Sequence, residues 1–232
     1  MSAALPWLPQ GTVYGALLNF RREWDLWAPQ MTQAPYKAAP QAPVLYIKTA
    51  NTFAPCGAAI AVPDEVDVGA TLGLVIGGFE EKLPPALAES AQAATKKEAG
   101  GLHRIAGCVL LNDLSLPHAS YYRPPIKFRN RDGFLGCGPV LQAVPDLSTL
   151  ALELRINGTL AQRIELSTLV RDAATLLRDV SEFMTLQAGD VLMLGTDCLP
   201  DGTRPRAKAG DRIEISAPGF APLVNTLVED AA

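Results

Sequence analysis

The chain has 232 residues, and its 20 Lys and Arg against 24 Asp and Glu give a formal net charge of −4 at pH 7. Hydrophobic residues make up 48% and charged residues 19% of it, which excludes a chain that is disordered as a whole. The acidic balance offers no positive field for a phosphate backbone, and no apolar run approaches the ~20 residues of a membrane span, so neither a nucleic acid nor a membrane is expected as a partner.

The chain is expected to begin with an extension, residues 1–43, that packs on a domain formed by residues 44–232. Within the extension, Gly15–Phe20 is apolar and Arg21–Trp27 has the composition of a short helix. Four prolines between positions 29 and 43 then exclude a regular helix. We therefore predict an extended connection over the surface before the domain starts.

Short apolar runs bounded by turn-forming residues predict buried strands at Val44–Lys48, Ala58–Val62 and Leu72–Ile76. Pro84–Pro85 and the alanine-rich segment after it predict a helix that ends before Gly100–Gly101, since proline is accepted in the first turn. Ile105–Leu111 again has the character of a buried strand. The stretch that follows, Asn112–Asp132, is polar and contains prolines, and we expect a loop with turn-forming side chains there.

The clearest local pattern is the alternation of apolar and polar residues in Leu150–Arg163. It contains Asn157–Gly158, a pair that favours a tight hairpin because both positions tolerate positive φ. Leu169–Met184 places its apolar residues on one helical stripe. Val191–Leu194 and Asp211–Ser216 predict two more strands. With 19 glycines and 19 prolines and no internal repeat, these elements indicate one strand-rich α+β domain.

The cysteines show no C-x-x-C spacing, and they stand at Cys56, Cys108, Cys137 and Cys198. In a chain of this size we interpret them as buried or free thiols of a reducing compartment rather than a disulfide framework. The first residues are apolar, contain Pro6 and Pro9, and lack a basic leader. These features predict a cytoplasmic protein without a signal peptide.

Generic catalytic signatures are scarce. The sequence has no G-x-S-x-G elbow, phosphate loop, dinucleotide fingerprint or H-E-x-x-H motif. His103 and His118 are the only histidines, so a histidine-rich transition-metal site is excluded. Asp113, Ser115 and His118 are close in sequence, but a nucleophilic triad from one short loop is disfavoured because the partners usually come from separate elements.

Several separated segments carry more information when they are taken together: Tyr46–Lys48 with Asn51–Thr52, Thr71–Gly77, Gly107–Ser115, Arg129–Phe134, and Leu186–Thr196 continued by Ala209–Asp211. This series resembles the fumarylacetoacetate hydrolase superfamily, over nearly the whole chain from Gly11 to about Val228. Tyr121–Lys127 and Ser181–Phe183 are most similar to one subgroup. That subgroup is the N-terminal half, or separate N-terminal subunit, of the bifunctional isomerase/decarboxylases of 4-hydroxyphenylacetate (homoprotocatechuate) breakdown.

The resemblance implies a fold and a chemistry. The fold is an α+β, mixed β-roll with a few peripheral helices, and the substrates are 2-oxo or 2-hydroxydienoic acids. Most members hold an Mg²⁺-like ion with a Glu-x-Glu pair on one strand and an Asp on the next, and hard oxygen ligands suit that ion. The metal acts as a Lewis acid that stabilises an enolate. No organic cofactor is implied.

This chain departs from the family at the metal ligands. Gly69 and Thr71 stand at the Glu-x-Glu positions, and only Asp113 matches the third ligand. A single aspartate would be a poor Mg²⁺ site. Asp64, Glu65 and Asp67, just upstream, supply a carboxylate only if the register shifts; a solvated strand edge or turn is the simpler interpretation of that acidic run.

The remaining candidates form a cationic pocket. By the resemblance, Lys48, Asp113 and Arg129 are the catalytic candidates, and Arg129 stands where the superfamily has a lysine. Arginine cannot act as a base, but it can clamp a carboxylate with two hydrogen bonds. The open alternatives are a turn or cap for Asp113 and a solvated loop face for the arginines. The candidates for substrate binding are Asn112, Arg131 and Thr196.

A further departure concerns water activation. Glu23 stands where some members carry a histidine, so the His–Glu dyad that activates water is missing and hydrolysis of a carbon–carbon bond is disfavoured. The function implied is a subunit of a 2-hydroxyhepta-2,4-diene-1,7-dioate isomerase / 5-oxopent-3-ene-1,2,5-tricarboxylate decarboxylase. Without the two carboxylates it would perform the keto–enol tautomerisation, while a paired subunit decarboxylates.

Two alternatives remain open from the sequence. One alternative to the isomerase is a catalytically silent structural partner of a metal-bearing homologous subunit. The other is a metal-dependent hydrolase of the same superfamily. All three hypotheses predict a small di- or tricarboxylate or a homologous chain as partner. Because the composition is apolar and low in charge, we also expect a homo-oligomer or hetero-oligomer.

Overall fold

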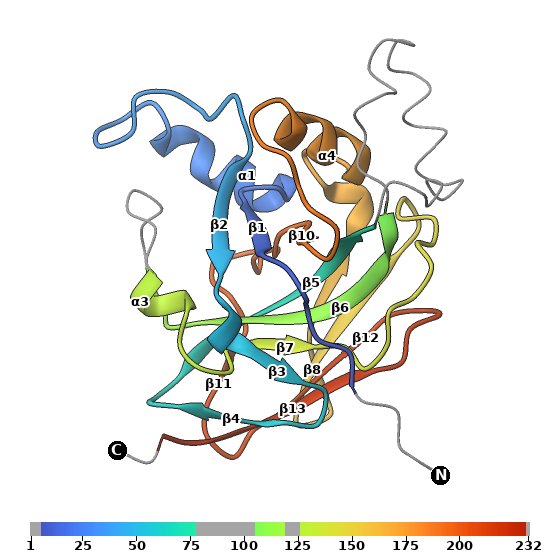
Figure 1. Cartoon of the computed structure of the whole chain (residues 1–232). Helices are drawn as coiled ribbons and strands as arrows, with labels where there is room; N and C mark the ends of the chain where they lie inside the picture. Colours follow the sequence, from blue (N-terminus) through green and yellow to red (C-terminus); the bar gives the residue numbers. More distant parts are fainter. Residues whose placement is uncertain (1–5, 78–104, 119–125, 231–232) are drawn as a thin grey trace.

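The computed structural model describes residues 6–77, 105–118 and 126–230. Two β-sheets form the body of this part, and the helices around them are short (Figure 1). This confirms the expected α+β class with mixed sheets and a few peripheral helices. None of the helices in these residues is long and apolar enough to cross a membrane.

The larger sheet has eight strands, and its path runs β2-β1-β10-β5-β6-β7-β3, with β11 pairing β5 at the side. Pairing is mixed: β1 is parallel to β10, β3 is parallel to β7, and the other pairs are antiparallel. The strands are β1 (Val13–Leu17), β2 (Val44–Lys48), β3 (Phe53–Pro55), β5 (Val66–Ile76), β6 (Ile105–Ser115), β7 (Leu135–Cys137), β10 (Val191–Met193) and β11 (Arg206–Ala207).

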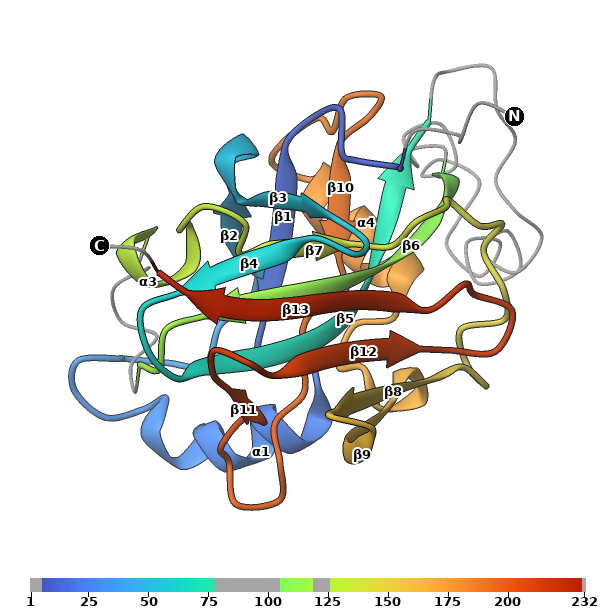
Figure 2. The same cartoon turned by 90° about the horizontal axis from the view of Figure 1, so that it is seen from below.

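The second sheet has five strands in the order β4-β13-β12-β8-β9 and lies across the larger one, as Figure 2 shows. Its β8–β9 hairpin confirms the turn predicted at Asn157–Gly158, whose φ angles are 52° and 80°. The strands are β4 (Ala59–Val62), β8 (Ala151–Ile156), β9 (Thr159–Glu165), β12 (Arg212–Ser216) and β13 (Leu223–Glu229).

The helices and helical turns lie at the margins of the sheets (Figure 1). Among the described residues the longest helix is α4, which buries Leu176, Leu177 and Val180 in the core between the sheets. The helices are α1 (Arg21–Trp27), α3 (Ile126–Arg129) and α4 (Ala173–Ser181), and the 3₁₀ turns are Ala28–Gln30, Ala50–Thr52 and Leu166–Thr168.

Both faces of the larger sheet are buried, and successive residues of its central strands point to opposite faces. Even-numbered residues of β5, such as Leu72, face the core between the sheets, whereas odd-numbered ones, such as Val75, face a smaller cluster around Val13, Tyr46 and Leu111. A strand buried on both faces reads as a continuous apolar run rather than an alternating one.

The structure extends or shortens several predicted elements. The predicted β2 and α1 match the observed bounds, but β5 begins at Val66 rather than at residue 72, and β6 continues to Ser115 through residues expected in a loop. The helix predicted after Pro84–Pro85 lies outside the described residues. The domain boundary at residue 43 stays a prediction, although β1, from the first segment, lies between β2 and β10 in the sheet.

Candidate functional site

A buried cluster of charged residues is centred on Asp113, near the end of β6. Lys48 Nζ lies 2.8 Å from Oδ1 of Asp113, and Arg129 Nη1 lies 3.2 Å from Oδ2. The Tyr46 hydroxyl donates a hydrogen bond to the same Oδ2. The side chains of Lys48, Asp113 and Arg129 are 0%, 1% and 5% exposed, so the carboxylate meets its two cations away from solvent.

Three elements position this cluster. Tyr46 and Lys48 are two residues apart on β2, so their side chains point to the same face of the strand. Lys48 Nζ also donates to the carbonyl oxygens of Leu114, at 2.9 Å, and of Arg129, at 2.5 Å, which ties β2 to β6 and to α3. The Arg129 guanidinium lies over the Tyr46 ring, with Cζ 4.5 Å from its centroid, a cation–π contact.

The protonation states follow from burial and charge. Burial by itself would raise the pKa of Asp113, but the Lys48 and Arg129 cations hold it below its ordinary value. Burial lowers the pKa of Lys48, and the Asp113 carboxylate opposes that shift. Burial and the same carboxylate raise the pKa of Tyr46, which keeps the phenol protonated. The cluster therefore places one carboxylate between two basic side chains.

The residues around Asp113 do not fit the Mg²⁺ site that the resemblance implies. Gly69 lies opposite Asp113 in the β5–β6 pair, and a Cβ at that position would lie 2.5 Å from Thr196 Cγ2, so Thr196 fills the space next to it. Thr71 is buried, and its Oγ1 has no hydrogen-bond partner. The described residues contain no group of three or more His, Cys, Asp or Glu that could hold a metal. Both Asp113 oxygens face cationic or hydroxyl donors instead.

The remaining candidates lie in different places. Thr196 is buried against Gly69 and so borders the cluster. Asn112 is on the opposite face of β6 from Asp113, next to Gly136 and Asn225, and its amide atoms have no hydrogen-bond partner. Arg131 is partly exposed and pairs with Asp230 at 2.8 Å. The structure thus brings Lys48, Asp113, Arg129 and Thr196 together but not Asn112 or Arg131.

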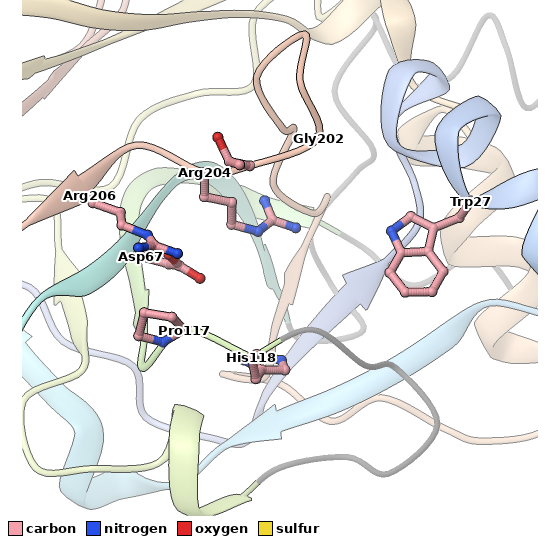
Figure 3. A pocket seen from close by; sticks show the side chains of 8 residues that line it. Trp27, Asp67, Pro117, His118, Gly202, Arg204 and Arg206 are labelled. Atoms are coloured by element: carbon pink, nitrogen blue, oxygen red, sulfur yellow. The ribbon is translucent and has the colours of Figure 1, made fainter.

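A pocket of about 440 Å³ opens at the same end of the β5–β6 pair as Asp113, and Figure 3 shows its lining. Asp67 reaches it from β5, two residues before Gly69 and on the same face. In Figure 3 the Arg204 side chain projects between Asp67 and the ring of Trp27, with His118 below it. The lining consists of Trp27, Asp67, Pro117, His118, Gly202, Thr203, Arg204 and Arg206.

Carboxylates hold the two arginines of the pocket. Arg206 Nη1 donates to Glu65 Oε2 at 3.0 Å, and its Nε donates to Asp67 Oδ1 at 3.2 Å. Arg204 pairs with the buried Glu23, which also accepts a hydrogen bond from the backbone N–H of Leu18 at 3.1 Å. Glu23 stands where the resemblance implies a histidine in some family members. Here its carboxylate holds the Arg204 guanidinium in place.

Sequence reasoning missed part of this site. It quoted Tyr46 without giving it a role, although its i, i+2 relation to Lys48 on an expected strand was the available signal. It considered His118 only as a member of a nucleophilic triad, which it disfavoured. It did not consider Trp27 and Arg204, and no local pattern pointed to either, since they come from distant parts of the chain.

Comparisons with known proteins agree with this architecture. The model of the family described as fumarylacetoacetate (FAA) hydrolase C-terminal matches residues 12–228. The 4-hydroxyphenylacetate degradation bifunctional isomerase/decarboxylase of Escherichia coli is 38% identical over 224 residues, which cover 95% of this chain and 48% of that protein. The chain thus spans about half the length of the curated relatives it matches.

Two solved structures extend the comparison. The 5-carboxymethyl-2-hydroxymuconate delta-isomerase of Mycobacterium smegmatis is 25% identical, with a TM-score of 0.68 over 95% of this chain and 80% of that one. The maleylpyruvate hydrolase of Sphingobium sp. SYK-6, solved with manganese(II) and pyruvate, is 20% identical. Its TM-score is 0.66 over 97% of this chain and 72% of that one, so this likeness shows the shared fold.

Proposed function

The chain belongs to the fumarylacetoacetate hydrolase family, and we propose that it tautomerises a 2-hydroxydienoic diacid of the 2-hydroxyhepta-2,4-diene-1,7-dioate type to the 2-oxo-3-ene form. The observation that carries this proposal is that the pocket with Arg204 and Arg206 lies at the same end of the β5–β6 pair as Asp113, which is paired with Lys48 and Arg129. A diacid that becomes a dienolate needs positive groups at its carboxylates and near its developing charge, and this arrangement supplies both.

Fixed charges would do the electrostatic work. The two pocket arginines bind carboxylate groups of the substrate, and the Trp27 ring provides a flat apolar wall for the conjugated chain. The basic side chains of the Asp113 cluster stabilise the dienolate because they are already oriented by their own hydrogen bonds and need not reorganise. Thr196, which borders the cluster, is a neutral donor toward the substrate oxygens.

The proposed reaction is the tautomerisation rather than the decarboxylation. A keto–enol shift only relocates a proton beside a stabilised enolate, whereas loss of CO₂ benefits more from a metal as electron sink. The ion pairs of Asp113 with Lys48 and Arg129 support a chain that works without resident Mg²⁺. The Escherichia coli relative, about twice as long and bifunctional by name, supports a division in which a paired metal-bearing subunit decarboxylates.

The proposed setting is a cytoplasmic oligomer, formed either with a second copy or with a homologous subunit. Large apolar side chains on the surface support it: Ile47 on the sheet-edge strand β2 is 41% exposed, and Ile126 on α3 is 61% exposed. Surface of this kind is often covered by another chain.

The test follows the dienol absorbance of 2-hydroxyhepta-2,4-diene-1,7-dioate with the purified chain, in EDTA and in excess Mg²⁺. We expect equal rates in both.

Arg206→Gln removes a charge-assisted hydrogen bond of about 1.5–3 kcal/mol, so KM should rise by roughly tenfold or more. Arg212→Gln is the matched control, because Arg212 is as exposed as Arg206 and pairs with a glutamate outside the pocket, and it should leave KM unchanged. Magnesium-dependent CO₂ release by the chain alone would contradict the proposal.

A silent structural partner is the second candidate function, and one observation favours it: Asp113 is already neutralised by groups of its own chain. In that case the chain alone neither turns over the dienol nor binds a diacid, yet it raises the activity of a co-purified homologue that bears the Glu-x-Glu pair. A metal-dependent hydrolase would instead show tight one-to-one Mg²⁺ binding by calorimetry.

A further inference from the structure

We propose that His118 is the catalytic residue that moves the proton in this pocket, with Nε2 as the base toward the substrate hydroxyl. The inference rests on the proposed function and goes beyond it, because Lys48, Asp113 and Arg129 do not line this pocket and the Asp113 carboxylate is ion-paired with both basic side chains. His118 lines the same pocket as the two arginines and Trp27. It is the one histidine in the described part of the chain.

The hydrogen bonding of His118 settles which ring nitrogen is basic. Nδ1 lies 3.0 Å from the carbonyl oxygen of Leu116, and a carbonyl oxygen only accepts, so Nδ1 carries the hydrogen. In a neutral imidazole the other nitrogen, Nε2, then has the lone pair. The ring stacks on Phe128 with centroids 5.6 Å apart, which holds its plane. The tautomer and the orientation of the base are therefore both fixed before substrate arrives.

The surroundings favour the neutral form. Burial lowers the pKa of His118, and the positive charges of Arg129 on α3 and Arg204 lower it further. The Asp67 carboxylate on β5 and the carbonyl of Leu116 oppose this shift. The remaining charged group of the lining is Arg206, which is itself paired with Asp67. The result lies below the ordinary value of 6.5, so His118 is ready to accept a proton at neutral pH.

The step balances without a co-reactant. Nε2 takes the proton of the 2-hydroxyl group, and the O–H electron pair forms the C2=O bond. The C2=C3 double bond moves to C3=C4, and the electrons of C4=C5 take up a proton at C5. The imidazolium supplies that proton, so His118 returns to its neutral form and the diacid is isomerised with no change of charge. The arginines keep the two carboxylates in place throughout.

The experiment compares wild type, His118→Gln and Asp67→Asn by dienol kinetics from pH 5 to 8, with exogenous imidazole as a rescue reagent. In the wild type kcat/KM falls as pH drops through the His118 pKa, below about 6.5, because the protonated ring no longer accepts a proton. His118→Gln should lower kcat by 10²–10⁴-fold, remove this acid limb and regain rate with imidazole. Asp67→Asn keeps His118 but removes the carboxylate charge that raises the pKa of His118. The acid limb of kcat/KM in this variant should therefore move to lower pH.

Two measurements distinguish loss of the catalytic base from loss of folded structure, and test the base separately from the proposed substrate. Calorimetry with heptanedioate should give the same Kd for His118→Gln and wild type, since the arginines are unchanged. Deuterium exchange at C3 of 2-oxoadipate in D₂O, followed by NMR, reads proton abstraction independently of the dienol. His118-dependent exchange without dienol turnover would keep this inference and overturn the proposed substrate. Dienol turnover in His118→Gln with wild-type kcat and acid limb would overturn the inference alone, and absence of both activities in the wild type would overturn both.

Discussion

Asp113 keeps its charge in the interior because two cations and one hydroxyl group surround it. Removing one partner from a buried ion pair leaves a desolvated charge, and this costs far more than the same change at the surface. The cluster therefore ties stability to the electrostatics of the site. The same arrangement shows how the negative charge of Asp113 is balanced within the chain: Lys48 and Arg129 both pair with its carboxylate.

Replacing Lys48 by Met tests this at the residue scale. We expect Lys48→Met to lower the free energy of unfolding by about 3 kcal/mol, since Asp113 stays buried with one cation fewer. Lys208→Met, at an exposed position, should change it by less than ~0.5 kcal/mol. The Lys48→Met/Asp113→Asn double variant should lose less than the sum of the single losses, by urea denaturation. Additive losses would show that the two side chains do not interact.

Helix α4 illustrates how tertiary contacts set the bounds of an element. The apolar stripe predicts a helix over Leu169–Met184, but the helix begins at Ala173. Leu169 forms a β-bridge with Phe20, and the Val170 N–H donates to the Asn19 carbonyl at 2.8 Å. Backbone groups held by another segment are not available for the first helical turn. The shortened helix then depends on its cap and on the packing of its buried face.

The cap of α4 can be tested on its own. The Asp172 side chain accepts a hydrogen bond from the Thr175 N–H at 2.7 Å, which satisfies one of the free donors of the first turn. Asp172→Ala should lower the free energy of unfolding by about 1 kcal/mol, as measured by urea denaturation. Asp172→Asn keeps the acceptor and should stay near the wild type. Equal losses in the two variants would assign the effect to charge rather than to capping.

At the scale of the whole molecule, one sheet separates two apolar clusters. Cys108 on β6 belongs to the cluster between the sheets, and Cys137 on β7 belongs to the smaller cluster on the other face. These strands are neighbours in the same sheet, so neither cluster can be opened without breaking its strand pairing. Burial raises the pKa of both thiols to about 12, which keeps them unreactive in the folded protein.

Pulsed thiol labelling across a urea gradient measures this coupling. Cys108 and Cys137 should become reactive at the same urea midpoint, because exposure of either needs global unfolding. Cys56, which is only partly buried, should label in the native state and serves as the internal control. Separate midpoints for the two buried thiols would mean that the clusters unfold independently.

Part of this protein follows from the sequence by itself. The β8–β9 turn depends on two adjacent residues that tolerate positive φ, α1 and β2 are short local patterns, and the segments that carry the family resemblance can be read directly. These features depend on neighbouring residues or on residue identity, so no knowledge of long-range contacts is needed.

The assembly of the site depends on contacts between residues far apart in the sequence. β6 runs through Asn112 and Asp113 because both faces of that strand are covered, and its alternation then sends the two side chains to opposite faces of the sheet. The pocket joins Trp27, His118 and Arg204 from separate elements. Strand pairing, burial and the neutralisation of a buried charge are set by residues far apart in sequence, and their energies arise only when the chain has brought those residues together.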